Sequence, residues 1–177
     1  IHDYDIPQYF KDHPYIDGIV SGEGEVAFVE MLEAYLDGKS FEGIKGVSYK
    51  KPDEEVVIGK KREPNMELDR LPSPFLDGTF DMLLEKNPGV FTGVVSESNR
   101  GCPFTCTFCY WGGPDSKIAQ FSMDRVLKEL DWISKNKISY IFGADANFGI
   151  LKRDLDIAQY LAKLHQLLAG LCKSNQF

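Results

Sequence analysis

The chain has few basic residues, few histidines and no long apolar run, and each shortage excludes a class of protein. Its 20 lysines and arginines are outnumbered by 27 aspartates and glutamates, so the net charge is −7. General nucleic-acid binding needs a basic surface, so we expect no nucleic-acid partner. No apolar stretch approaches the ~20 residues that span a bilayer. No basic-then-apolar secretory signal opens the sequence.

Cysteine is also scarce, and its placement is uneven. The chain has four cysteines, and three of them, Cys102, Cys106 and Cys109, lie in the run NRGCPFTCTFCYWGG. This usage indicates a metal site in a reducing compartment and not a disulfide framework, so we expect a cytoplasmic protein. Thiolates with this C-x3-C-x2-C spacing favour iron–sulfur clusters, zinc or copper(I). A [4Fe–4S] cluster usually takes four cysteines, so a loop with three leaves one iron for a non-protein ligand.

A zinc site is the simplest alternative, and it needs a fourth protein ligand. The candidates are Cys172 and the three histidines, His2, His13 and His165. Cys172 follows leucines at helical spacing, which is typical of an apolar core thiol. A non-catalytic iron–sulfur or zinc-binding module therefore remains an alternative to an enzyme.

The first half of the chain predicts the end of an open α/β sheet followed by a connecting segment. A short apolar strand at 15–20 precedes the turn Ser21-Gly22-Glu23-Gly24-Glu25, and an apolar helix then runs to about Asp37. Residues 43–60 predict a small hairpin. Residues 61–89 contain four prolines and little apolar periodicity, which is typical of a linker.

The second half predicts another α/β region. A strand at 90–96 leads into the cysteine loop, and Ser122 is suited to cap a helix with an apolar face. A second strand is expected at 138–143 and a second helix from about 154 to 168. This order of elements implies parallel strands joined by crossover connections. Because the chain begins at Ile1 and not at methionine, we expect it to be a fragment of a longer protein.

The pattern C-x3-C-x-aromatic-C, with Phe108 as the aromatic, resembles the signature of radical S-adenosylmethionine (SAM) enzymes. In that family the three cysteines hold a [4Fe–4S] cluster and SAM chelates the fourth iron. The reduced cluster cleaves SAM to methionine and a 5′-deoxyadenosyl radical. The resemblance implies that Cys102, Cys106 and Cys109 bind the cluster. It also implies that Phe108 packs near the adenine and that the backbone around Tyr110 meets its edge.

The family's second motif is a polar turn after the second strand, which receives the methionine amino group of SAM. The corresponding turn here, Gly143-Ala144-Asp145, departs from the usual Gly-Gly-Glu. Ala144, Asp145 and Asn147 are therefore candidate SAM contacts by resemblance.

The turn with Gly22 and Gly24 resembles the last strand and helix of the Rossmann-like domain in cobalamin-dependent radical SAM enzymes. Glycines there let the backbone approach the nucleotide tail of cobalamin. The resemblance implies an α/β chain with three parts: the end of that domain at 1–42, a hairpin and proline-rich linker at 43–89, and the first units of a partial (β/α) barrel at 90–177. A simple strand-to-helix turn is the alternative for the glycine pair.

By the same resemblance, the expected activity is methyl transfer to an unactivated centre of a small-molecule or peptide substrate. A flavodoxin or ferredoxin is the expected electron donor. A radical SAM enzyme without cobalamin, such as a methylthiotransferase or a rearrangement enzyme, is the alternative. Most of the substrate residues are expected outside this chain, and a fragment without activity of its own is a further alternative.

Overall fold

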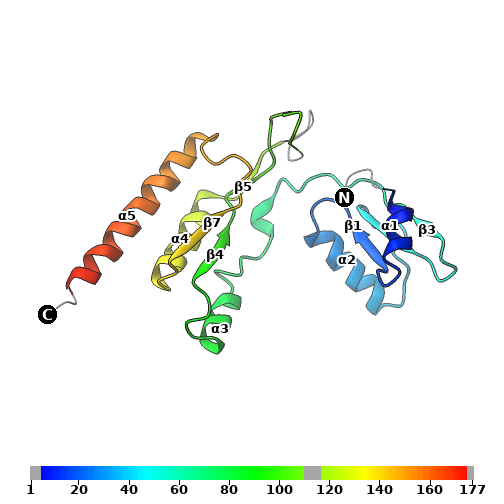
Figure 1. Cartoon of the computed structure of the whole chain (residues 1–177), viewed down its shortest axis with the longest axis horizontal. Helices are drawn as coiled ribbons and strands as arrows, with labels where there is room; N and C mark the ends of the chain where they lie inside the picture. The colour runs from blue at the N-terminus through cyan, green and yellow to red at the C-terminus, as the bar shows by residue number, and fades with distance from the viewer. Residues whose placement is uncertain (1–4, 110–116, 175–177) are drawn as a thin grey trace. The chain divides into compact units, whose positions relative to one another are not determined.

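The computed structural model describes residues 5–109 and 117–174, with side chains in the last helix described as far as residue 166. It is an α/β structure that divides into two compact units, residues 1–65 and residues 66–177 (Figure 1). Each unit has its own strands and its own apolar core. Within the described ranges, none of the helices combines the length and apolar character needed to cross a membrane.

The first unit is a small antiparallel sheet with two helices. Its strands, in spatial order, are β1 (Gly18–Val20), β2 (Val47–Lys50) and β3 (Val56–Val57). Its helices are α1 (Ile6–Asp12) and α2 (Glu25–Leu36). The antiparallel pairing of β2 with β3 confirms the expected hairpin. Helix α1, with Asp5 as its N-cap, was not expected from the sequence.

Helix α2 confirms the helix expected after the glycine turn, but most of its apolar side chains are exposed. Ala27 is fully buried in a core with Val47 and Tyr49. By contrast, Phe28 and Leu36 are 55% and 80% exposed. Strand β1 pairs antiparallel with β2, with Ile19 opposite Ser48. Within the described residues, β2 is the strand that pairs with β1. Helix α2 therefore packs on the sheet through a narrow row of residues. In the described part of the chain, the rest of the apolar side chains of α2 are exposed.

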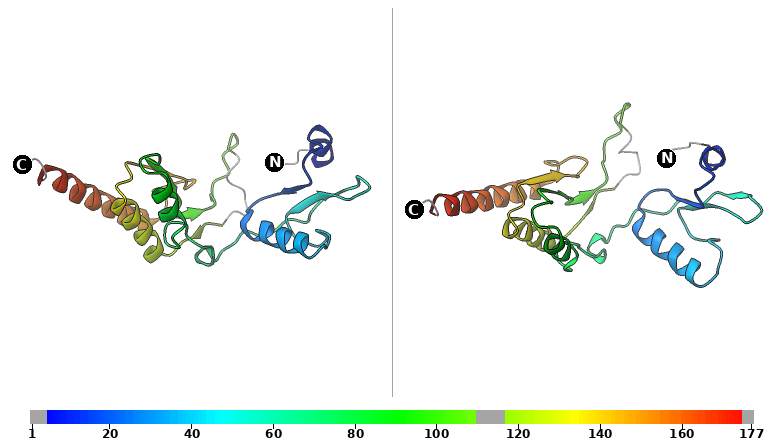
Figure 2. Two further views of the ribbon diagram at one scale, coloured as in Figure 1. Left: turned by 90° about the horizontal axis from the view of Figure 1, so that it is seen from below. Right: turned by 60° about the horizontal axis from the view of Figure 1, so that its bottom comes forward.

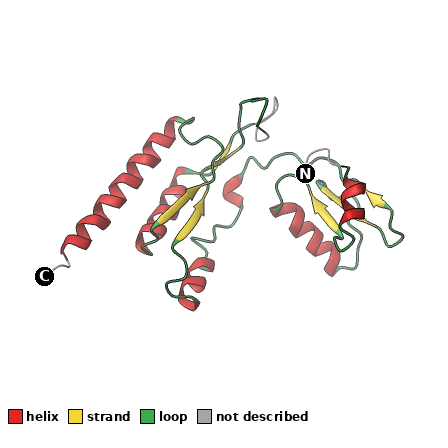
Figure 3. Ribbon diagram, in the orientation of Figure 1, coloured by secondary structure: helices red, strands yellow, loops and turns green. Residues whose placement is uncertain are grey.

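The second unit is built on a pair of parallel strands, β4 (Gly93–Ser96) and β7 (Tyr140–Gly143). Figure 3 shows them side by side and pointing the same way. The chain between them passes through helix α4 (Met123–Lys135), and helix α5 (Lys152–Ser174) follows β7. This order confirms the expected strand–loop–helix–strand–helix arrangement with parallel strands.

Helices α4 and α5 contact each other and share a core with one face of the strand pair (Figure 2). The expected apolar face of α4 is confirmed, because Val126, Leu130 and Ile133 are all buried. Ile157 of α5 joins the same core. The helix begins as expected at Ser122, whose Oγ accepts a hydrogen bond from the backbone N–H of Arg125. Local sequence signals therefore determine the position of α4.

The segment before β4 has more structure than the prolines indicate. It contains a 3₁₀ turn, η1 (Leu68–Arg70), and helix α3 (Thr79–Lys86), neither of which was expected. Phe75, which lies between these two elements in the sequence, is buried. Its ring meets those of Phe80 and Trp132 edge-on, with centroid distances of 4.9 and 5.5 Å. Tertiary packing of these rings holds a short helix that its own sequence does not predict.

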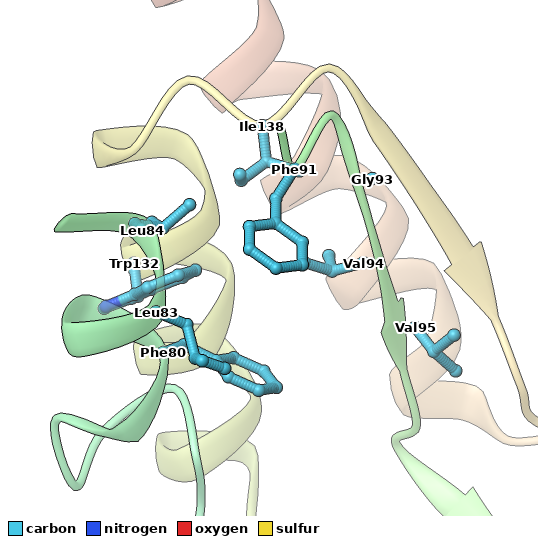
Figure 4. Close-up of a pocket in the computed structure, with 9 residues that line it drawn as sticks. All are labelled: Phe80, Leu83, Leu84, Phe91, Gly93, Val94, Val95, Trp132 and Ile138. Atoms are coloured by element: carbon cyan, nitrogen blue, oxygen red, sulfur yellow. The ribbon is translucent and has the colours of Figure 1, made fainter. Parts of the chain in front are cut away.

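An apolar pocket of about 270 Å³ lies beside the amino-terminal end of β4 (Figure 4). Helix α3, strand β4 and helix α4 all contribute to its wall. The lining residues are Phe80, Leu83, Leu84, Phe91, Gly93, Val94, Val95, Trp132 and Ile138. None of these lining residues carries a titratable side chain, so the wall of the pocket offers apolar contacts.

Candidate functional site

The cysteine loop begins just beyond the carboxyl-terminal ends of the parallel strands. Two short strands, β5 (Asn99–Arg100) and β6 (Ala119–Gln120), close it by antiparallel pairing of Asn99 with Gln120 and Arg100 with Ala119. We call residues 98–102 and 117–121 the loop base, and residues 103–109 the loop tip. The position at the end of a parallel strand confirms the sequence analysis, whereas the β5–β6 ladder was not expected.

Gly101 lets the two sides of the loop base approach closely. Its φ is +98°, and a β-carbon at this position would lie 2.2 Å from the carbonyl oxygen of Lys117. Any other residue would clash with that backbone and would also occupy an unfavourable conformation. The close pairing of the loop base therefore requires glycine at position 101, directly before the first cysteine.

Asp145, just after β7, binds the backbone of the loop base. Its Oδ1 accepts hydrogen bonds from the N–H groups of Ser98, at 2.6 Å, and Asn99, at 2.9 Å. Its Oδ2 accepts from the Ser98 hydroxyl at 2.6 Å. Ser98 and Asn99 are buried, so these bonds satisfy polar groups that water does not reach. Asp145, which the resemblance makes a candidate SAM contact, thus binds the start of the cysteine loop in this structure.

Arg153, at the start of α5, binds both sides of the loop base. Its guanidinium donates to the carbonyl oxygens of Phe121, at 2.6 Å, and Ser98, at 2.9 Å. The Ser98 carbonyl also accepts the N–H of Phe121 at 3.1 Å. Sequence reasoning missed Arg153 and Ser98 because no motif surrounds either residue, and their contact joins positions that are 55 residues apart.

The carboxylate of Asp69 holds the exit from the loop base. Both of its oxygens accept the backbone N–H of Ser122, at 3.0 and 3.2 Å. This hydrogen bond is the main reason that the pKa of Asp69 lies below its ordinary value of 3.8, and the nearby cations Arg125 and Arg153 act in the same direction. The negative charge also suits the amino-terminal end of α4.

The three cysteines have different surroundings. Cys102 belongs to the loop base and is only 5% exposed, and the side-chain amide of Asn147 donates to its sulfur at 2.8 Å. Cys106 and Cys109 lie in the exposed loop tip, where the Cys109 N–H bonds the Cys106 carbonyl at 3.1 Å. Phe108 is 92% exposed. Tyr110 lies outside the described residues.

Among the residues that the structure describes, no three His, Cys, Asp or Glu side chains are gathered closely enough to hold a metal ion. The structure thus places the three cysteines on one loop without bringing their sulfurs into a ligand set. The donor chemistry nevertheless fits an iron–sulfur cluster, because the soft thiols lie close in sequence. The buried Cys102 sulfur also receives an N–H donor, as cluster ligands do.

The remaining candidates lie at two separate places. Ala144 extends the parallel ladder through its N–H, which bonds the Ser96 carbonyl at 2.9 Å. Gly22 and Gly24 belong to the first unit, in the turn before α2, and no heavy atom lies within 4 Å of a β-carbon built on either. That backbone is open to close approach, which is the property the resemblance requires of it.

No protein-family model matches the chain. Among curated proteins, it is 38% identical over 159 residues to the cobalamin-dependent radical SAM methyltransferase TokK of Streptomyces tokunonensis. It is also 38% identical over 158 residues to 2-(S-pantetheinyl)-carbapenam-3-carboxylate methyltransferase of Streptantibioticus cattleyicolor. These matches cover 88% and 87% of this chain, and in each case 23% of the relative. The chain thus spans less than a quarter of the length of these relatives.

Solved structures show the same fold at lower sequence identity. A structure of OxsB, a cobalamin-dependent SAM radical enzyme with aqua-cobalamin and SAM bound, matches 90% of this chain and 22% of its own, with a TM-score of 0.62 and 23% identity. The radical SAM methyltransferase TsrM from Kitasatospora setae matches 97% of this chain and 32% of its own, with a TM-score of 0.57 and 17% identity. The chain is therefore a homologue of the cobalamin-dependent radical SAM methyltransferases and has an α/β fold that resembles theirs.

Proposed function

We propose that this chain is the part of a cobalamin-dependent radical SAM methyltransferase that carries the cluster loop. The observation that supports this most is the 38% identity with TokK across 88% of the chain. A match of that extent necessarily includes the cysteine loop, which lies well inside the sequence. The parallel β4–β7 pair adds support, because α/β enzymes place their chemistry at the carboxyl ends of such strands.

Cys102, Cys106 and Cys109 would hold a [4Fe–4S] cluster, with SAM completing the site. When bound, this cluster would supply the electron for reductive cleavage of SAM. The chain's own contribution is positional: Asp145 and Arg153 hold the loop base, so the first ligand, Cys102, has a defined place before any cofactor arrives. The exposed loop tip leaves Cys106 and Cys109 accessible to incoming iron.

The SAM contacts remain predictions at Phe108, Tyr110, Ala144, Asp145 and Asn147. Phe108 suits an adenine contact because its ring is almost entirely exposed at the loop tip. Asp145 and Asn147 already have partners in the loop base, so a role toward SAM would be additional or would require them to change partners.

The chain would contain the end of the cobalamin-binding domain at 1–42, the hairpin and linker at 43–89, and the start of a partial barrel at 90–177. The open backbone at Gly22 and Gly24 supports a cobalamin contact there. A flavodoxin or ferredoxin is the proposed electron donor, and a small molecule or peptide is the proposed substrate. The cytoplasm is the proposed location, because a reducing compartment keeps the three cysteines available as ligands.

The test is anaerobic reconstitution of the full-length protein with iron and sulfide. We expect about four iron atoms per chain, as a [4Fe–4S] cluster requires, and an electron paramagnetic resonance signal of the reduced cluster that changes when SAM is added. Replacing Cys102, Cys106 or Cys109 with serine should abolish the signal. Cys172→Ser is the matched control and should keep it.

Two further readouts separate the alternatives. The purified protein should show the visible absorbance of cobalamin, and a spectrum without it would favour a radical SAM enzyme that does not use this cofactor. A reduced cluster whose signal is unchanged by SAM would instead favour an iron–sulfur module without this chemistry. Iron-free protein that binds zinc would refute the cluster altogether.

A further inference from the structure

The side chain of Asn147 reaches the sulfur of Cys102. Its amide nitrogen donates to Cys102 Sγ at 2.8 Å across 45 residues of sequence. Cys102 is 5% exposed, and Asn147 is half-buried. Among the described residues, no comparable donor reaches the sulfur of Cys106 or Cys109, which are exposed. The three proposed ligands therefore differ in their hydrogen bonding.

The turn that carries Asn147 is held on both sides. Before it, Asp145 binds the backbone of Ser98 and Asn99. After it, Oδ2 of the buried Asp154 accepts the N–H groups of Gly149, at 2.8 Å, and Leu151, at 2.9 Å. The Asn147 carbonyl accepts the Ile150 N–H at 3.3 Å. The amide is thus presented to the sulfur by a turn with fixed ends.

We propose that Asn147 is a positioning residue that raises the reduction potential of the cluster through its hydrogen bond to Cys102. This inference rests on the proposed function, in which the three cysteines hold a [4Fe–4S] cluster. One electron from a low-potential one-electron donor adds one negative charge to the cluster and its thiolates. An N–H directed at a ligating sulfur stabilises the more negative, reduced form more than the oxidised form. Burial strengthens the effect, because water does not compete at Cys102.

The size of the effect follows from one hydrogen bond to a charged sulfur. Its loss should lower the ratio of reduced to oxidised cluster at a fixed potential by about tenfold, which is about 59 mV for a one-electron couple. Asn147→Leu removes the donor at similar volume. Asn147→Asp removes it and adds a negative charge, so its shift should be larger and in the same direction. Asn147→Gln keeps a donor and should recover part of the potential.

The experiment is a redox titration of the reconstituted full-length protein without SAM, followed by electron paramagnetic resonance. Potentials are compared only between preparations with the same iron content per chain. Asn87→Asp is the matched control, because it makes the same chemical change at an amide that bonds the Leu83 carbonyl beside α3. Its potential should equal that of the unmodified protein.

We expect the reduction potential to be highest in the unmodified protein. It should then fall in the order Asn147→Gln, Asn147→Leu, Asn147→Asp. Equal potentials in all variants would overturn the inference. If the potentials are equal and a separate titration with SAM shows weaker binding in the variants, Asn147 is a SAM contact and the inference is wrong. Loss of the cluster in all three variants would make it a structural support and would also overturn the proposal. Failure of the unmodified protein to bind a cluster would refute the proposed function itself.

Discussion

The two ends of the β4–β7 strand pair are built from different interactions. At the carboxyl end, charged side chains hold backbone groups: Asp145 binds the N–H groups of Ser98 and Asn99, and Arg153 binds the carbonyl oxygens of Ser98 and Phe121. At the amino end, aromatic and aliphatic side chains surround an apolar pocket.

This difference between the two ends indicates that one end mainly contributes free energy of folding and the other mainly fixes atomic positions. Apolar burial is nearly non-directional, so the amino end contributes free energy without specifying exact positions. Hydrogen bonds to ionised groups are strong and directional, so the carboxyl end specifies where the cysteine loop begins and ends. Substitutions at the two ends should therefore have different consequences for unfolding free energy and for iron content.

The largest expected effect on stability is at the amino end. Phe75→Ala removes a buried ring that packs against Phe80 and Trp132, and should cost about 3–5 kcal/mol in unfolding free energy. Denaturant titration measures this loss. The folded fraction should still take up iron, because the rings that Phe75 meets, Phe80 and Trp132, line the apolar pocket at the amino end. Reduced iron content in the folded protein would break the comparison.

A smaller but more specific effect is expected from Gly101→Ala. The new methyl group would meet the Lys117 carbonyl at the loop base, so we expect a loss of about 2–4 kcal/mol and reduced iron content. Gly89→Ala is the matched control at the amino end, where φ is +76° but no heavy atom lies near the added β-carbon. The control should lose only about 1 kcal/mol and no iron. Equal iron contents for the two variants would contradict the role of the loop base.

Asp145→Asn tests the charge at the carboxyl end. The amide keeps the shape of the carboxylate but loses its charge, so its bonds to the Ser98 and Asn99 N–H groups weaken and the Ser98 hydroxyl has to accept instead of donate. We expect a loss of about 2–3 kcal/mol. Iron content should fall with it, because Cys102 follows the segment that Asp145 holds. Asp77→Asn makes the same change beside α3, where Asp77 accepts the N–H of Thr79, and should leave iron content unchanged.

The smallest effect should appear at Asp69 and should depend on pH. The pKa of Asp69 is lowered by the Ser122 N–H, so its stabilisation is fully present above 3.8 and is lost as the pH falls through the lowered pKa. Because the side chain is exposed, Asp69→Asn should cost less than about 1 kcal/mol at neutral pH. Unfolding titrations of both proteins between neutral and acidic pH should converge at the acidic end. A constant difference at every pH would mean that the charge is not responsible.

Much of the second unit follows from local sequence. The Ser122 cap and the apolar spacing of Val126, Leu130 and Ile133 are short-range signals, and they correctly predict α4. The strands at 90–96 and 138–143 are confirmed, with β4 and β7 shorter than the predicted runs. Helix α3 was missed because its stability depends on rings that it packs against, among them Trp132 far along the chain.

The candidate site shows the same division. Cys102, Cys106 and Cys109 are recognisable because ligand spacing is a local property of the chain. The partners of Asp145 and Asn147 were not predictable, because these side chains act across 45 to 47 residues, and a sequence motif carries no information about such partners. Arg153 has no motif around it at all.

The sequence by itself determined which side chains are available: three cysteines at close spacing, an aromatic residue among them, and the periodic strands and helices on either side. The tertiary structure decided which cysteine is buried, which amide reaches its sulfur, and that the carboxylate of Asp145 binds the backbone at the loop base. The physical reason is the distance along the chain over which each property is determined. Ligand type and helix periodicity are properties of neighbouring residues, whereas burial and hydrogen-bond partnership depend on which distant segments the parallel strands bring together.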